Sequence, residues 1–235
     1  VYDHPSKDHE RKLKAFIARH FSLPKFVAAP TSLNFNGAGS VIGYTMPYVK
    51  KAKSFRDLSN KNFRISHKIN NKRVVSLYLN DAKTLEAIHN QRIVVGDRND
   101  QNLLFVDNNS YYIDFDSVQF DGFACPVATE NYLDPALYSI DLSLKPVFVP
   151  NHDWYSYAVM LFRNLLLVHP YGGTHPKLND LPQRALQRIT VFDKKVIYPS
   201  VGLPPDLISD DLLHVFSKYF KDGWRGPFPQ SELIR

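Results

Sequence analysis

The chain has 235 residues, of which 44% are hydrophobic and 22% charged, the composition of an ordinary globular protein. No apolar run approaches the roughly 18 residues of a membrane span, and the single cysteine, Cys125, excludes an intramolecular disulfide. We therefore expect a reducing, cytoplasmic compartment and no membrane partner. The net charge of +6 comes from scattered basic residues without a zinc-finger spacing or an RNA-binding aromatic signature, so a nucleic-acid partner is not expected.

The first 49 residues combine one helical pattern with two strand patterns. Apolar residues at helical spacing predict a helix over residues 7–20, with a basic opposite face. Two short strands are predicted at residues 25–34 and 40–49, and the glycines of residues 36–39 suit a tight hairpin between them. The polar stretch 50–71 follows, and we expect it to contribute little to the core.

The rest of the chain is predicted to be mainly helical. Residues 72–90 carry a broad apolar stripe at helical spacing, whereas residues 116–150 show no clean period and several prolines, which is typical of a functional or disordered loop. Short strands are predicted at residues 93–95, 103–106 and 111–113. Helices are predicted at residues 153–168, which are apolar enough for a buried central helix, and near residues 178–190 and 208–220.

Two polar turns at the ends of short strand-like runs carry the clearest chemistry. Asn102 and Asp114 can supply the oxygen ligands that a phosphate-bound Mg²⁺ prefers. Asp97 lies five residues before Asn102, far enough to face an incoming hydroxyl rather than the metal. An aspartate in that position orients the nucleophile and accepts its proton during phosphoryl transfer.

These residues resemble motifs of the protein-kinase catalytic domain, most closely those of bacterial protein-kinase-like proteins. Residues 95–102 match the catalytic loop H-R-D-x-x-x-x-N from its aspartate onward, and residues 114–116 match D-F-G. Residues 128–136 look like the end of an activation segment, G-T-x-x-Y-x-A-P-E. Residues 152–158 and 169–173 look like the start and the tail of the central buried helix of that family.

The resemblance implies an α+β fold of the protein-kinase-like, two-lobe type. A partial, β-rich small lobe would occupy residues 1–49, and a mainly helical large lobe would occupy residues 50–235. The implied reaction is transfer of the γ-phosphoryl group of ATP to a Ser or Thr hydroxyl of a protein substrate, with Mg²⁺ as cofactor. The oligomeric state is left open.

The resemblance also implies roles for the residues of the two turns. Asp97 would be the catalytic base, Asn102 and Asp114 would hold Mg²⁺ and the nucleotide phosphates, and the hydroxyl of Thr129 would contact Asp97. Asp153 would tie down the backbone of the catalytic loop.

The nucleotide-binding residues implied by the resemblance lie in the first 49 residues. Residues 46–49 resemble the strand-to-hinge segment, with Met46 at the gatekeeper position and backbone groups of Pro47 and Val49 offered to adenine. Glu10 would pair with the ATP-binding lysine. Neither a Gly-rich loop nor a lysine strand precedes Glu10, so we expect that lysine upstream of the chain, with residues 1–5 continuing from its strand.

The chain departs from the family pattern at several positions. Asn99 replaces the lysine that many Ser/Thr kinases place two residues after the aspartate, and the direction of Arg98, which could compensate, is left open. Ala136 replaces the glutamate of A-P-E, which should remove an ion pair that stabilises the lobe. Asp116 replaces the glycine of D-F-G and should make that loop stiffer and more acidic.

Two other functions stay open at this point. A small-molecule phosphotransferase of the aminoglycoside or choline kinase type shares the D-x-x-x-x-N pattern, although the matches at residues 128–136 and 153–157 argue against it. A regulatory pseudokinase that binds a nucleotide without transferring phosphate is favoured by the missing lysine strand.

Overall fold

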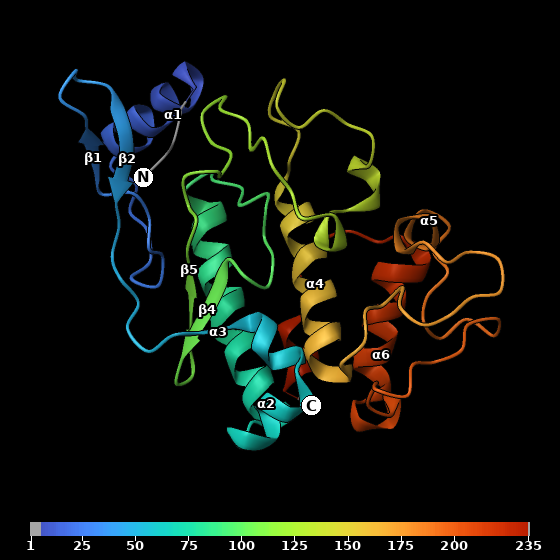
Figure 1. The fold of residues 1–235 in the computed structure, drawn as a ribbon. Coiled ribbons are helices and arrows are strands. Elements are labelled where there is room, and N and C mark those ends of the chain that lie inside the picture. Colours follow the sequence, from blue (N-terminus) through green and yellow to red (C-terminus); the bar gives the residue numbers. More distant parts are fainter. Residues whose placement is uncertain (1–5, 235) are drawn as a thin grey trace.

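The structure is a computed structural model that describes residues 6–234, so the continuation of a strand expected at residues 1–5 lies outside the described residues. Within them the chain is a mixed α+β protein with a two-stranded and a three-stranded sheet. Helix α1 and strands β1 and β2 lie together at one side, α3 and α4 run through the centre, and α5 and α6 lie at the opposite side (Figure 1). No described helix combines the length and the apolar character needed to cross a membrane.

The N-terminal part begins with α1 (Lys7–Ala18), which the Ser6 side chain caps by accepting a hydrogen bond from the His9 amide at 3.1 Å. Strands β1 (Ser32–Phe35) and β2 (Val41–Thr45) form the predicted antiparallel hairpin, closed by Gly39 at a φ of +77°. The helix and the hairpin are thus confirmed.

The strand predicted from residue 25 begins only at Ser32. The residues before it pair instead with β5: the Ala28 amide donates to the Tyr112 carbonyl at 2.8 Å, and the Tyr112 amide donates to the Phe26 carbonyl at 2.9 Å. This pairing buries the apolar residues that suggested a longer strand, namely Val27, Ala28 and Ala29. It also ties the N-terminal part to the body of the molecule.

The expectation that residues 50–71 contribute little to the core was wrong. This stretch forms β3 (Lys53–Ser54), a 3₁₀ turn (Phe55–Ser59) and α2 (Lys61–Ser66), and it buries Phe55 and Leu58 completely. The Arg64 side chain is also buried, and it donates to the carbonyls of Ile69 and Asn164 at 3.1 and 2.9 Å. A polar composition therefore conceals three core residues, Phe55, Leu58 and Ile69, and a buried arginine with carbonyl partners.

The three-stranded sheet has the order β3–β4–β5 and is antiparallel. Strand β4 (Leu103–Val106) and strand β5 (Asn109–Tyr112) alternate buried and partly exposed side chains, as a half-buried sheet requires. The strand predicted at residues 93–95 is reduced to a single bridge between Val94 and Gln119.

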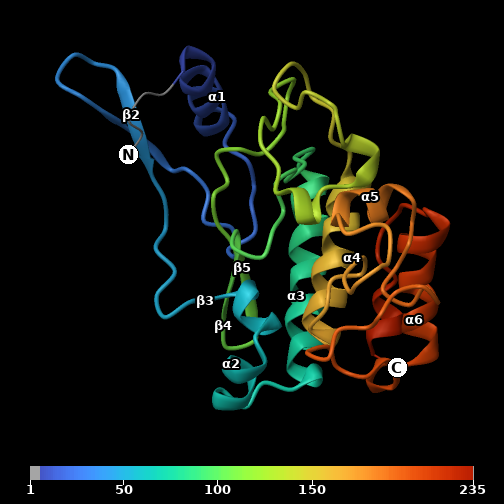
Figure 2. The ribbon, with the colours of Figure 1, turned by 45° about the vertical axis from the view of Figure 1, so that its right-hand side comes forward.

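Helices α3 (Asn71–Asn90) and α4 (Pro150–Leu166) form the centre of the core and lie side by side in both views (Figures 1 and 2). Helix α4 is buried around most of its circumference, as its apolar sequence predicted, and it ends where Leu167 takes a left-handed conformation at φ +58°. The predicted stripe of α3 is fully buried and consists of Val74, Leu77, Tyr78, Leu85 and Ile88.

Residues 116–149 are largely irregular, as expected, with two 3₁₀ turns at Glu130–Tyr132 and Pro135–Leu137. The first C-terminal helix is shorter than predicted, because α5 spans only Leu181–Leu186. The second is confirmed: α6 spans Asp210–Ser217 and continues directly into a π-helical turn, Lys218–Asp222. Two further 3₁₀ turns lie at Pro205–Leu207 and Gln230–Leu233.

Candidate active site

The catalytic-loop candidate, residues 95–102, is anchored at its start by Asp153 of α4. This completely buried carboxylate accepts hydrogen bonds from the Val95 and Gly96 amides at 2.8 and 2.9 Å, and His89 Nε2 lies 2.8 Å from it. The expected attachment of Asp153 to the loop backbone is therefore confirmed. Because α4 is the most buried helix of the chain, the loop is fixed to a rigid support.

Gly96 allows the loop to turn at this point. Its φ is +75°, and a Cβ atom here would lie 2.7 Å from the Cys125 sulfur, which is itself completely buried. Glycine is therefore required both by the backbone conformation and by the closeness of Cys125.

Gly96→Ala is expected to lower the free energy of unfolding by about 1–3 kcal/mol, because the alanine would combine an unfavourable φ with a collision in a closed space. Urea denaturation measures the loss. Gly122→Ala is the matched control, since Gly122 has a similar φ of +86° but no atom within 4 Å of the added Cβ. Equal losses in the two variants would contradict the role of Cys125.

Asp97, the candidate base, is held through one of its two oxygens. Oδ1 accepts from the Thr129 amide and the Thr129 hydroxyl, both at 2.8 Å, and from Asn99 Nδ2 at 3.1 Å. The expected contact between Thr129 and Asp97 is thus present. These three bonds all end on Oδ1 and orient the carboxylate, whereas no described residue forms a hydrogen bond with Oδ2.

Asn102 lies directly between Asp97 and the second turn. Its Nδ2 donates to the Asp97 carbonyl at 3.1 Å, and its own carbonyl accepts from the Ile113 amide at 3.0 Å, one residue before Asp114. The side chain of Asn99 supports this turn, because its Oδ1 accepts from the Asn102 amide at 3.0 Å. The sequence-predicted residues 97, 102 and 114 are therefore brought together.

Asp114 stands in a left-handed conformation at φ +58° and in a negative environment. Loss of hydration, together with the nearby carboxylates of Asp116 and Asp97, raises the pKa of Asp114 to about 6. A bound divalent cation would offset the repulsion between these neighbouring carboxylates. Within residues 6–234 there is no cluster of three or more His, Cys, Asp or Glu side chains suited to a metal, so a cation here would depend on Asn102, Asp114, water and phosphate oxygens.

Asp116 connects this turn to the N-terminal part. Its Oδ1 accepts from the Tyr44 hydroxyl of β2 at 2.9 Å, and its Oδ2 lies 3.5 Å from His9 Nε2 of α1. The sequence gave no indication of this contact, because Tyr44 and His9 belong to separate elements far from residue 116 and follow no local pattern. In place of a D-F-G glycine, the chain thus has a carboxylate that contacts both α1 and β2.

Lys12 makes a second connection from α1. The side chain is almost completely buried, and its Nζ donates to the carbonyls of Ser117 and Ala124, each at 2.7 Å. Burial lowers the pKa of Lys12 to about 8, against the attraction of Cys125 and Asp116. The lysine therefore fastens the loop that follows Asp116 to α1.

Lys12→Met is expected to remove a pH dependence of stability. Because the folded chain binds fewer protons at Lys12 than the unfolded chain between about pH 8 and the usual pKa of 10.5, the free energy of unfolding of the wild type rises with pH in that window, by up to about 1.4 kcal/mol per pH unit. Urea denaturation at pH values across the window should show a flatter profile for Lys12→Met and an unchanged one for Lys7→Met, an exposed lysine of the same helix. Parallel profiles for wild type and Lys12→Met would contradict the prediction.

Glu10 does not belong to the buried face of α1. It forms an ion pair with Lys14 at 2.6 Å, one turn further along, whereas the buried residues of this helix are Lys12, Leu13 and Phe16. Pairing of Glu10 with a distant lysine would require it to leave Lys14.

The hinge candidate, residues 46–49, follows β2 as an irregular, mostly exposed segment. Met46 is 40% exposed, Pro47 is exposed and Val49 is half-buried. Among the described residues, none forms a hydrogen bond with the backbone of residues 47–49. The contact with adenine that the resemblance implies for Pro47 and Val49 stays a prediction.

Arg98 cannot replace the missing lysine beside Asp97. It points into the core, where it forms an ion pair with Asp81 of α3 and stacks on Tyr157 with 5.2 Å between its guanidinium and the ring centre. The Tyr112 hydroxyl donates to the other oxygen of Asp81 at 2.6 Å. The open question of its direction is thus answered: Arg98 supports the loop from within.

Ala136 cannot form the ion pair expected to be lost at this position, but a neighbouring carboxylate forms one. Two residues earlier, the almost completely buried Asp134 forms a forked ion pair with Arg225, whose Nη2 donates to Oδ1 at 3.0 Å. The Arg225 guanidinium also stacks on Tyr155 of α4 at 4.3 Å. The end of the 128–136 segment is therefore fastened to the C-terminal part by another carboxylate.

No protein-family model matches the chain, and no curated protein sequence matches it. A function therefore has to be inferred from the geometry around Asp97.

Proposed function

We propose that the chain is a protein-kinase-like phosphotransferase that transfers the γ-phosphoryl group of ATP to a Ser or Thr hydroxyl of a protein. One observation carries this proposal: two turns that are separate in the sequence meet through direct hydrogen bonds, so that Asp97, Asn102 and Asp114 share one site. Residues 6–49 and 50–234 would be the described portions of a small and a large lobe.

In the proposed reaction Asp97 orients the acceptor hydroxyl and takes its proton. Oδ1 is occupied by Thr129 and Asn99, so Oδ2 is the oxygen that faces the acceptor. The carboxylate is fixed before the substrate arrives, which reduces the entropy lost on reaching the reactive arrangement. Thr129 and Asn99 are positioning residues in this scheme.

The residues around Asp114 fit a magnesium ion. The Asp114 carboxylate and Asn102 Oδ1 would be its protein ligands, and the carboxylates that raise the pKa of Asp114 supply the negative charge that a cation offsets. When bound, Mg²⁺ would neutralise the charge on the ATP phosphates. ATP would place its adenine against the open backbone of Pro47 and Val49, beside Met46.

A regulatory, nucleotide-binding module is the second candidate. It is favoured by Glu10, whose partner is Lys14 of its own helix rather than a lysine that could contact a nucleotide. A small-molecule phosphotransferase would also use residues 97, 102 and 114, but it gives no reason for the fastening of the 128–136 segment by Arg225.

The test is transfer of the labelled γ-phosphoryl group of ATP by the full-length protein in the presence of Mg²⁺. Label in protein Ser or Thr is the expected result. Label only in small alcohols such as aminoglycosides or choline would favour a small-molecule phosphotransferase. Nucleotide binding without any transfer would favour the regulatory module, and either outcome would overturn the proposal.

A further inference from the structure

A wide polar hollow of about 650 Å³ opens beside the catalytic-loop candidate. Its wall is formed by the 3₁₀ turn Phe55–Ser59, the start of α2 and the C-terminal half of α4. Three of its lining residues are cations, Arg56, Lys61 and Arg163, and one is an anion, Asp57. Three cations against one carboxylate make the hollow predominantly basic, and Asp57 itself accepts a hydrogen bond from the Ser54 amide in a capping box.

The donors of these cations remain available. Arg56 and Lys61 are exposed, and no described residue forms a hydrogen bond with either side chain. Arg163 uses only Nη1 within the described structure, donating to Asp100 Oδ2 at 3.0 Å and to the Tyr132 hydroxyl. These two bonds orient the Arg163 side chain, which is about one-third exposed. No described residue accepts a hydrogen bond from its Nε or Nη2.

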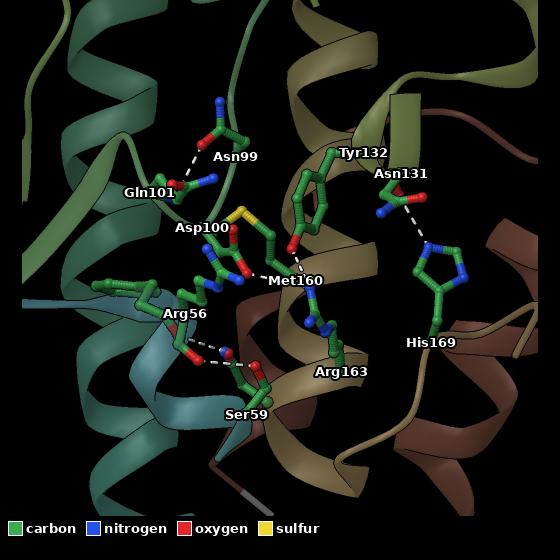
Figure 3. Close-up of polar contacts among 12 residues, drawn as sticks. Arg56, Ser59, Asn99, Asp100, Gln101, Asn131, Tyr132, Met160, Arg163 and His169 are labelled. Carbon is green, nitrogen blue, oxygen red and sulfur yellow. Dashed lines mark hydrogen bonds and ion pairs between the residues drawn. The ribbon is translucent and has the colours of Figure 1, made fainter. Parts of the chain in front are cut away.

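The two partners of Arg163 belong to the segments that hold the candidate base. Figure 3 shows Arg163 pointing from α4 toward Asp100 and Tyr132, with Arg56 on the neighbouring segment. Asp100 is three residues after Asp97, and Tyr132 is three residues after Thr129. A peptide with its hydroxyl at Asp97 that runs past Asp100 and Tyr132 would bring its neighbouring side chains toward Arg163, at about 3.3 Å per residue of extended chain.

We propose that this hollow is a specificity subsite that binds acidic side chains of the acceptor protein, two to four residues from the phosphorylated hydroxyl. The inference rests on the proposed function, because it takes Asp97 as the reaction centre. The cations Arg56, Lys61 and Arg163 supply charge complementarity, and the forked donors of arginine suit carboxylates.

The form of the hollow favours a peptide over a nucleic acid. The residues that line it include no aromatic side chain on which a base could stack, and its apolar members are Leu167 and Val201. The hollow of about 650 Å³ has room for more than one carboxylate side chain of an extended peptide.

The kinetic test compares Ser-containing peptides that carry glutamates two to four residues before the serine, after it, or nowhere, with glutamine in the neutral positions. Wild type is expected to prefer one glutamate peptide by about tenfold in kcat/KM, equivalent to about 1.4 kcal/mol. Arg56→Glu/Lys61→Glu, at two exposed positions, should abolish or reverse the preference for the glutamate peptide over the neutral one. Lys83→Glu/Lys218→Glu changes the net charge by the same amount at exposed positions outside the hollow. This control should keep the preference for the glutamate peptide.

A binding experiment separates this inference from the proposed function. The glutamate peptide with alanine in place of serine cannot be phosphorylated, and its affinity is measured by calorimetry at two salt concentrations. Binding that is lost in Arg56→Glu/Lys61→Glu supports the subsite even if no transfer to any protein is found. Transfer without a glutamate preference overturns the subsite alone, and tighter binding of a single-stranded oligonucleotide of equal charge also overturns it. Arg163→Gln, which keeps a donor for Asp100, should weaken peptide binding about tenfold or less.

Discussion

Asp97→Asn is expected to lower the rate of phosphoryl transfer by about 10²–10⁴-fold, the usual contribution of a positioned general base. Asparagine has the size of aspartate, and its carbonyl oxygen can still accept from the Thr129 amide and hydroxyl. The amide group that replaces Oδ2 cannot take a proton. The loss should therefore appear in kcat, with the affinity for ATP and Mg²⁺ and the free energy of unfolding nearly unchanged.

Asp107→Asn is the matched control for this variant. Asp107 is an exposed residue of the turn between β4 and β5, at a φ of +53° that asparagine tolerates well. Transfer of labelled phosphate should be at the wild-type rate in this control. A rate within tenfold of wild type for Asp97→Asn would contradict the role of Asp97 as the base.

Arg98→Met is expected to have the largest effect on stability, a loss of about 3–5 kcal/mol in the free energy of unfolding. Methionine fills much of the volume of the arginine but leaves the completely buried Asp81 without its cation. The Tyr112 hydroxyl continues to donate to Asp81, which offsets only part of the cost of a buried charge. For a chain of this length the midpoint of thermal unfolding should fall by about 10 °C.

The double variant Asp81→Leu/Arg98→Met tests the cause of that loss. Replacing both members of a buried ion pair by apolar residues removes the uncompensated charge, so the double variant should recover most of the stability that Arg98→Met loses. Urea denaturation of the wild type, both single variants and the double variant completes the cycle. Additive losses would show that the two side chains stabilise the fold independently.

The parts of the fold that the sequence predicted correctly depend on local patterns. The apolar stripe of α3, the apolar composition of α4 and the glycines between β1 and β2 each act within a few residues. The start of β1 was misplaced because residues 26–28 pair with Tyr112, more than eighty positions later. The burial of Phe55 was missed because its ring packs against Tyr78 of α3 and Phe105 of β4 rather than against its own polar neighbours.

The candidate site likewise contains residues that a local pattern predicted and residues whose contacts depend on the packing of distant segments. Asp97, Asn102 and Asp114 could be found because their spacing is itself a pattern, and Thr129 and Asp153 came with the same resemblance. The contacts of Asp116 with Tyr44 and His9 could not be found, since no spacing links three residues from separate elements. The direction of Arg98 was equally hidden, because it is decided by Asp81, which looks like any polar residue of an amphipathic helix until the helix is packed.

The joint contact of Asp116 with α1 and β2 has a thermodynamic consequence. If a nucleotide held at residues 46–49 favours one orientation of β2, the Tyr44–Asp116 hydrogen bond transmits that preference to the turn that carries Asp114. By linkage, the factor by which the nucleotide changes the affinity for a cation at Asp114 is also the factor by which the cation changes the affinity for the nucleotide. The nucleotide and the cation would then not bind independently, and the Tyr44 hydroxyl would be the group that couples their binding.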